Sequence, residues 1–374
     1  MSGLKPSAYS PCVTHRCVVT VCLTICLWVT VPATRPFAAE PPESKSDRVP
    51  LAIAALMRHH DRATGLWQTE GWWNAANTVT VLADAAAIDR TLVSPEILET
   101  TFVNAQNKFK LFRNDYYDDE GWWALAWIRA YDVTGDGKYL SMAKSIFDDM
   151  TSGWDATCGG GIWWKKDRHY KNAIANELFL SVAAQLAHRT TGAEANSYKK
   201  WANREWDWFE HSGMINTDSL VNDGLTTACE NNRRTTWSYN QGVLIGGLVE
   251  LAKVDGNPKP LETAQAIAHA AIDHLTDADG VLHDPTEPHC SEDTVQFKGI
   301  FVRNLQHLYE AAPNDGYAEF FRVNAGAIWT QARTANNEVS CSWSGPPEDR
   351  GAAALTSALD ALVADAAVHH RNPH

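Results

Sequence analysis

Residues 120–151, EGWWALAWIRAYDVTGDGKYLSMAKSIFDDMT, decide the fold of this chain. Apolar side chains recur every three or four residues on both sides of the turn TGDG at 134–137, so the segment predicts two helices, 120–134 and 138–151. A link this short makes the two helices antiparallel neighbours. The segment is therefore predicted to form a helical hairpin.

The same hairpin pattern recurs along the chain, and alternating strand patterns are almost absent. Helical periodicity predicts helices at 47–63, 75–90, 94–112, 120–134, 138–151, 171–190, 193–211, 237–253, 259–276, 292–312, 315–335 and 349–367. The links after even-numbered helices are short and made of turn residues, whereas those after odd-numbered helices are usually much longer. Six such hairpins side by side in a ring predict an all-α fold, the (α/α)6 barrel, with the even-numbered helices inside.

Antiparallel alternation places all the long loops at one end of this ring. These loops hold aromatic pairs, glycines and carboxylates in the segments Trp67, 72–74 (WWN), 115–123 (DYYDDEGWW), 158–164 (CGGGIWW), 237–242 (WSYNQG), 277–292 and 341–347. The 16 tryptophans in 374 residues are far above ordinary usage, and a pyranose packs its C–H face on such rings. The long loops therefore predict a carbohydrate-binding cleft.

Asp118 and Asp119 are the best-placed carboxylate pair in the chain. Cleavage of a glycosidic bond usually needs two carboxyl groups, one to protonate the leaving oxygen and one to attack or to activate water. Adjacent side chains that diverge in an extended loop place their carboxyls roughly 5–6 Å apart, which favours retention of configuration. In a partly desolvated cleft at the start of an inner helix, one of the two pKa values should rise, so that residue can serve as the acid.

Four motifs in this order resemble glycoside hydrolase family 76, namely YDDEGWW at 117–123, GGIWW at 160–164, NAIANE at 172–177 and WSYNQG at 237–242. That family contains bacterial endo-α-1,6-mannanases and related fungal cell-wall proteins thought to act as transglycosidases, on (α/α)6 barrels. The resemblance implies a retaining hydrolase of α-1,6-mannosidic linkages in mannan or lipomannan backbones. It also implies that Asp118 is the nucleophile that forms a covalent mannosyl-enzyme and that Asp119 is the general acid/base.

Further cleft residues are predicted from side-chain chemistry. Indole rings are expected to stack on sugar faces, although roughly half of the tryptophans are expected to pack in the core instead. Amides and phenols are expected to hydrogen-bond mannose hydroxyls. The predicted substrate-binding residues are Trp72, Asn74, Tyr117, Trp122, Trp163, Trp164, Asn176, Trp237, Tyr239, Asn240 and Gln241. Lys298 and Arg303 are left open between substrate contact and ion pairing, and neither a metal ion nor a cofactor is predicted.

The first residues differ in kind from the rest of the chain. The apolar run 17–31 carries no charged residue and predicts the core of a signal peptide spanning 1–33. A flexible linker at 34–47, a catalytic domain at 48–368 and a tail at 369–374 are predicted to follow. We therefore expect a secreted or cell-envelope protein with no stable membrane span in the mature chain, whereas a mis-called start codon would leave it cytoplasmic.

The four cysteines beyond this leader are Cys158, Cys229, Cys290 and Cys341. In an exported protein they form up to two disulfides, and sequence leaves three pairings open.

The net charge of −13, without a basic stripe, excludes nucleic acid as an expected partner. A polysaccharide, α-1,6-mannan or lipomannan, is the expected partner, and the oligomeric state stays open. Other readings are an (α/α)6 enzyme such as a sugar epimerase or an unsaturated glucuronyl hydrolase, for which Arg113, Arg233 and Arg234 offer basic groups. Mannan transglycosylation through the same intermediate, or non-catalytic glycan binding, would also use such a cleft.

Overall fold

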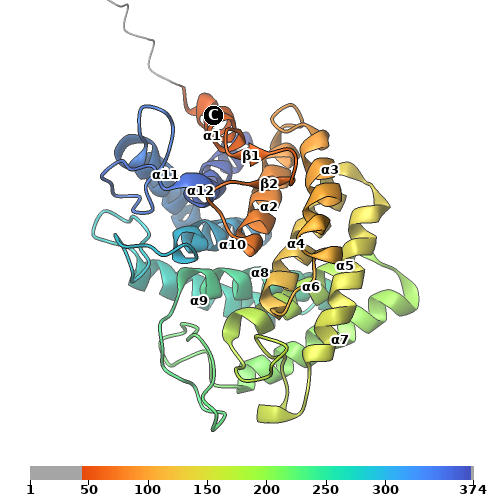
Figure 1. Cartoon of the computed structure of the whole chain (residues 1–374). Helices are drawn as coiled ribbons and strands as arrows, with labels where there is room; N and C mark the ends of the chain where they lie inside the picture. Colours follow the sequence, from red (N-terminus) through yellow and green to blue (C-terminus); the bar gives the residue numbers. More distant parts are fainter. Residues whose placement is uncertain (1–43, 372–374) are drawn as a thin grey trace, which may run out of the picture. The chain divides into compact units, whose positions relative to one another are not determined.

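The computed structural model describes residues 44–371, and within this range it contains twelve α-helices (Figure 1). They are α1 (Arg48–Met57), α2 (Trp72–Ile88), α3 (Pro95–Asn104), α4 (Tyr117–Thr134), α5 (Gly137–Met150), α6 (Ala173–Arg189), α7 (Gly192–His211), α8 (Ser238–Asp255), α9 (Lys259–Leu275), α10 (Phe297–Ala311), α11 (Asp315–Ala327) and α12 (Gly351–Arg371). The short elements are β1 (His60–Asp61), β2 (Leu66–Trp67), η1 (Lys45–Asp47), η2 (Ala105–Asn107), η3 (Lys110–Phe112), η4 (Thr151–Gly153), η5 (Thr157–Gly159), η6 (Thr294–Gln296) and η7 (Ile328–Ala332). The predicted signal peptide and most of the predicted linker lie outside the described residues.

The even-numbered helices form a closed inner ring. Each packs against the next, and α12 returns to α2, so the ring has no free edge (Figure 1). The outer helices α5, α7 and α9 pack on the inner helix that precedes or follows them, and α1 and α11 both pack on α12. The predicted (α/α)6 barrel, with the even-numbered helices inside, is therefore confirmed.

The amino-acid pattern explains which helices lie inside. In α6 every residue from Ala173 to Ala187 is buried, because both faces of an inner helix meet other helices. In α7 the buried residues are Tyr198, Ala202, Glu205, Trp206 and Phe209, which form one stripe at helical spacing. The last inner helix, α12, is long and apolar enough to cross a membrane, but most of it is buried as a core helix of the barrel.

Tight turns join the hairpins as the sequence predicts. α4 ends at Gly135, whose left-handed backbone (φ 73°) lets its N–H reach the carbonyl of Tyr131. Asp136 then accepts a hydrogen bond from the Lys138 N–H at 3.0 Å and so caps α5.

Several predicted helix boundaries were wrong. The first predicted helix stops at Met57, because the chain turns into the hairpin β1–β2 through Gly65 (φ 71°). The third α-helix stops at Asn104 and continues as the 3-10 turn η2, and Leu111 and Phe112, at the end of the predicted span, adopt left-handed backbone (φ 58° and 59°), which no α-helix accepts. Conversely, α4 begins at Tyr117, three residues before the predicted start, and α12 continues to Arg371.

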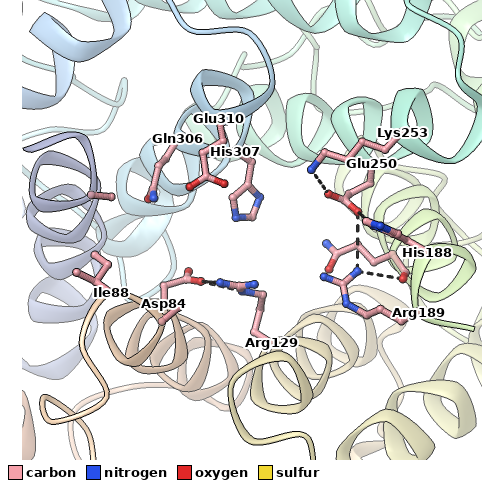
Figure 2. A pocket seen from close by; sticks show the side chains of 13 residues that line it. Asp84, Ile88, Arg129, His188, Arg189, Glu250, Lys253, Gln306, His307 and Glu310 are labelled. Atoms are coloured by element: carbon pink, nitrogen blue, oxygen red, sulfur yellow. Dashed lines mark hydrogen bonds and ion pairs between the residues drawn. The ribbon is translucent and has the colours of Figure 1, made fainter. Parts of the chain in front are cut away.

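Ion pairs join the inner helices at the end of the ring where they terminate (Figure 2). Side chains from all six inner helices line a polar cavity of about 490 Å³ there. Arg129 of α4 donates to Asp84 of α2 and, at 3.0 Å, to Asp132 of its own helix. Arg189 of α6 binds Asp132 at 2.7 Å and lies 3.8 Å from Glu250 of α8, so four neighbouring helices share one network.

We expect the Arg129→Met variant to lose about 3 kcal/mol of unfolding free energy, because Asp84 is left buried without its cation. The Arg322→Met variant is the matched control, since Arg322 pairs with Glu319 on the exposed face of α11 and should cost no more than about 0.5 kcal/mol. Urea unfolding of both variants measures the difference. Equal, small losses would show that the network does not hold the ring together.

Candidate active site

A cleft of about 650 Å³ collects side chains from four inner helices and from the long loops. Its lining residues are Trp73, Tyr116, Asp118, Asp119, Trp122, Trp164, Tyr170, Asn172, Asp223, Arg234, Tyr239, Asp293 and Phe297. Among them are the two predicted catalytic carboxylates and three predicted substrate-binding residues, Trp122, Trp164 and Tyr239. The structure therefore brings these five residues into one cavity.

The sequence predicts an extended loop for the carboxylate pair. The structure places the pair in the first turn of α4 instead, because the helix begins at Tyr117. Asp118 accepts a hydrogen bond at Oδ2 from the indole N–H of Trp164 at 2.9 Å, whereas its Oδ1 is buried and has no partner. Asp119 accepts at Oδ2 from the amide of Asn114 at 2.5 Å. The free N–H groups of the helix start favour negative charge at both residues.

Burial dominates the titration of this pair. It raises the pKa of Asp118 well above its usual range, the charge of Asp119 raises it further, and the Trp164 hydrogen bond opposes both. Burial also raises the pKa of Asp119 to about 6, with Asn114 opposing and the Asp293 charge adding to the rise. Burial and mutual repulsion therefore favour a single negative charge on the pair.

Four aromatic rings form a closed set in the same cleft. Trp73 stacks on Trp122 with 5.6 Å between centroids, and Trp122 lies 6.5 Å from Tyr239. Tyr239 stacks on Phe297 at 3.8 Å, and Phe297 returns to Trp73 at 6.1 Å. Trp73 also donates its indole N–H to Asp293 at 2.8 Å. This surface offers ring faces next to hydrogen-bond acceptors, which suits a sugar.

Residues 56–373 match the family model described as glycosyl hydrolase family 76. The chain belongs to glycosyl hydrolase family 76. A putative mannan endo-1,6-alpha-mannosidase of Schizosaccharomyces pombe is 27% identical over 69% of this chain and 63% of its own length. The mannan endo-1,6-alpha-mannosidase DFG5 of Candida albicans is 26% identical over 78% of this chain and 72% of its own length. The chain thus spans about two thirds of these relatives, and its assignment to a glycoside hydrolase family is confirmed.

Solved structures of family 76 have the same fold. An inactive variant of the alpha-1,6-mannanase GH76A of Salegentibacter sp. HEL1_6, in complex with alpha-1,6-mannotetrose, superposes with a TM-score of 0.79 at 21% identity. The match covers 87% of this chain and all of that one. Dfg5 from Chaetomium thermophilum, in complex with glucosamine, gives a TM-score of 0.77 at 19% identity over 87% of this chain and 92% of that one.

Three predicted substrate-binding amides are buried, do not line the cleft and bind the protein itself. Asn176 accepts from the Ile162 N–H at 2.7 Å and donates to the Ile162 carbonyl at 3.0 Å. Gln241 accepts from the Val221 N–H at 2.7 Å and donates to the Val221 carbonyl at 2.9 Å. In this family 76 chain such inner-helix amides hold the cleft loops in place. Asn74 likewise accepts from Gly71 and donates to Gln296.

Trp72, another predicted substrate-binding residue, does not line the cleft, whereas its neighbour Trp73 does. Consecutive residues of a helix point about 100° apart, and on α2 this turn directs Trp73 into the cleft and Trp72 away from it. Trp72 instead packs against Phe109, Phe112 and Trp123 beneath it.

The other predicted substrate-binding residues lie outside the cleft. Tyr117 is buried and meets the Ser152 hydroxyl at 3.0 Å, and Trp163 donates its indole N–H to Asp155 at 2.7 Å. Trp237 packs edge-on against Phe297, 5.6 Å away. Asn240 is fully buried, and neither polar atom of its side chain has a partner.

The loops contribute cleft residues that sequence analysis missed, among them Tyr170, Asp223 and Asp293. Tyr170 donates its hydroxyl to Asp223 at 2.5 Å. No helical period marks such positions, and an isolated loop Asp carries no signal of its own. Among the described residues, no group of three or more His, Cys, Asp or Glu side chains is arranged to hold a metal ion.

The structure shows the partners of the basic residues whose roles the sequence left open. Lys298 pairs with Glu287 at 2.5 Å and Arg303 with Asp360 at 3.0 Å, so both form ion pairs. Arg113 donates to the backbone and hydroxyl of Ser145, away from the cleft. Of the arginines considered for a uronate substrate, Arg234 alone lines the cleft.

Two disulfides join the loops around the cleft in pairs. Cys158–Cys229 links the loop before α6 to the loop before α8, across 71 residues of sequence. Cys290–Cys341 links the loops before α10 and α12, across 51 residues. Of the three pairings that the sequence left open, the structure has this one.

Proposed function

We propose that this chain is a secreted or cell-envelope hydrolase that cleaves α-1,6-mannosidic linkages in mannan or lipomannan backbones. The observation that carries the proposal is the half-buried pair Asp118 and Asp119 at the start of an inner helix, in a cleft with an aromatic surface. The named activity of the family 76 relatives supports the linkage.

The proposed mechanism retains the anomeric configuration. The Asp118 carboxylate attacks the anomeric carbon while Asp119 gives its proton to the leaving glycosidic oxygen, and a covalent mannosyl-enzyme forms. Asp119, now charged, takes a proton from water as that water attacks the same carbon and releases Asp118. The pair begins and ends with one proton, which agrees with the raised pKa of both carboxyls.

Substrate binding decides which carboxyl holds that proton. The electrophilic carbon lies against Asp118 and favours its charged form, whereas the leaving oxygen accepts a hydrogen bond from protonated Asp119. Trp164 further favours charge on Asp118 through its hydrogen bond.

Linear α-1,6-mannan tests this proposal, with an α-1,2- or α-1,3-linked mannan as the control. We expect short oligosaccharides from the α-1,6 chain alone, followed by product size over time. Products longer than the starting chain would indicate transfer to a second sugar in place of water. A folded protein that releases nothing from the α-1,6 chain would overturn the proposal.

A further inference from the structure

The two carboxylate oxygens of Asp118 have different surroundings. Oδ2 accepts the Trp164 indole N–H at 2.9 Å, whereas Oδ1 is buried in the cleft wall with no hydrogen-bond partner. The Trp164 indole N–H is therefore the side-chain contact that holds this carboxylate in place.

Trp164 is itself fixed on several sides. Its backbone N–H donates to the Tyr170 carbonyl at 2.8 Å, and its carbonyl accepts from the Tyr117 N–H at 2.9 Å, next to Asp118 in sequence. Its ring meets Tyr116 edge-on at 5.2 Å and Tyr170 edge-on at 6.3 Å. The indole N–H is thus held toward Asp118 by contacts that do not involve a ligand.

The support behind Trp164 reaches a second loop. Tyr170 donates to Asp223 at 2.5 Å and accepts from Asn232 at 2.8 Å. Asn232 lies three residues after Cys229, whose disulfide partner Cys158 precedes Trp164 on its own loop. One crosslink therefore joins the loop that carries Trp164 to the loop that supports Tyr170.

We propose that Trp164 is the positioning residue of the nucleophile, because its indole N–H orients the Asp118 carboxylate and favours its charged form. The inference rests on the proposed function. As the bond between the Asp118 carboxylate and the anomeric carbon forms, the glycosidic C–O bond breaks and Asp119 protonates the departing oxygen. The Trp164 N–H stabilises the Asp118 carboxylate before the attack and again when water releases it from the sugar.

The Trp164→Phe variant tests this role, because it keeps a ring in place and removes the N–H. The loss of a hydrogen bond to a charged group in the transition state lowers the rate constant by a factor of roughly 10 to 100. We therefore expect kcat on α-1,6-mannan to fall roughly 10- to 100-fold with KM nearly unchanged. The acid limb of the kcat/KM profile should move to higher pH, because Asp118 loses the donor that favours its charged form. A raised KM with unchanged kcat and pH profile would show a stacking surface only, and would overturn the inference.

Trp163→Phe is the matched control. It makes the same change one residue earlier, but the lost N–H serves Asp155, outside the cleft. We expect wild-type kcat and pH profile from this variant. If it shifted the acid limb as Trp164→Phe does, loosening of the loop would explain both results and the positioning role would fall.

A titration of the Asp118 carboxyl by carbon-13 NMR separates this inference from the proposed function. The Asp118→Asn variant assigns the signal, and wild type and Trp164→Phe are then compared without substrate. We expect the variant signal to titrate at higher pH. If wild type cleaves no mannan but this shift is present, the proposed function fails and the contact stands. If mannan is cleaved and the shift is absent, the contact has no effect on Asp118 and the inference fails.

Discussion

Asp118→Asn is expected to reduce kcat/KM on α-1,6-mannan by at least about 10⁴-fold, because an amide oxygen does not attack an anomeric carbon. The fold should survive, since the substituted side chain can still accept the Trp164 indole N–H and removes a buried charge. Mannan binding should persist and can be measured by calorimetry. Turnover is followed by the release of reducing ends.

Asp148→Asn is the matched control for this variant. Asp148 also belongs to an Asp-Asp pair, but it is exposed on the outer helix α5 and lies in no described cleft. We expect wild-type turnover from it. Residual turnover by Asp118→Asn within a factor of about ten of wild type would remove Asp118 from the role of nucleophile.

Asp119→Ala is expected to lower kcat about 10²- to 10⁴-fold, the usual contribution of a general acid/base. In the wild type the pKa of Asp119 is raised to about 6, so this carboxyl keeps its proton up to that pH. Activity should therefore fall as the pH rises through about 6. The variant should lose this basic limb. The pH profiles of wild type and variant measure the change.

Azide distinguishes an acid/base from a nucleophile at this position. It needs no general base, so it should restore turnover of an activated mannoside by Asp119→Ala and give a mannosyl azide of retained configuration. An azide product of inverted configuration would mean that Asp119 is the nucleophile. The two roles would then be exchanged between Asp118 and Asp119.

The fold could be predicted from sequence because two independent signals agree. Helical periodicity located the helices, and alternating link lengths, such as the TGDG turn at 134–137, showed how they pair. The carboxylate pair could be predicted because adjacency in sequence guarantees proximity in space. Neither inference needed knowledge of side-chain direction.

The placement of the other site residues could not be predicted, because it depends on side-chain direction or on partners far along the chain. Trp72 and Trp73 carry the same chemistry, and only the rotation of α2 about its axis decides which one faces the cleft. Asn176 and Gln241 are polar residues in recognised motifs, but their partners are loop backbone groups 14 and 20 residues away. Asp223 reaches the cleft from a loop without periodicity, so tertiary structure alone places it there.

The way the ring closes also bears on when the protein can fold during synthesis. Thr78 of α2 and Thr356 of α12 hydrogen-bond at 2.6 Å across 278 residues of sequence, and α12 fills the place between α10 and α2. Until α12 leaves the ribosome, both of those helices keep an uncovered apolar face. Translation adds about 5–20 residues per second, so these faces stay exposed for seconds between the synthesis of α10 and that of α12. The inner ring therefore cannot close before α12 is available.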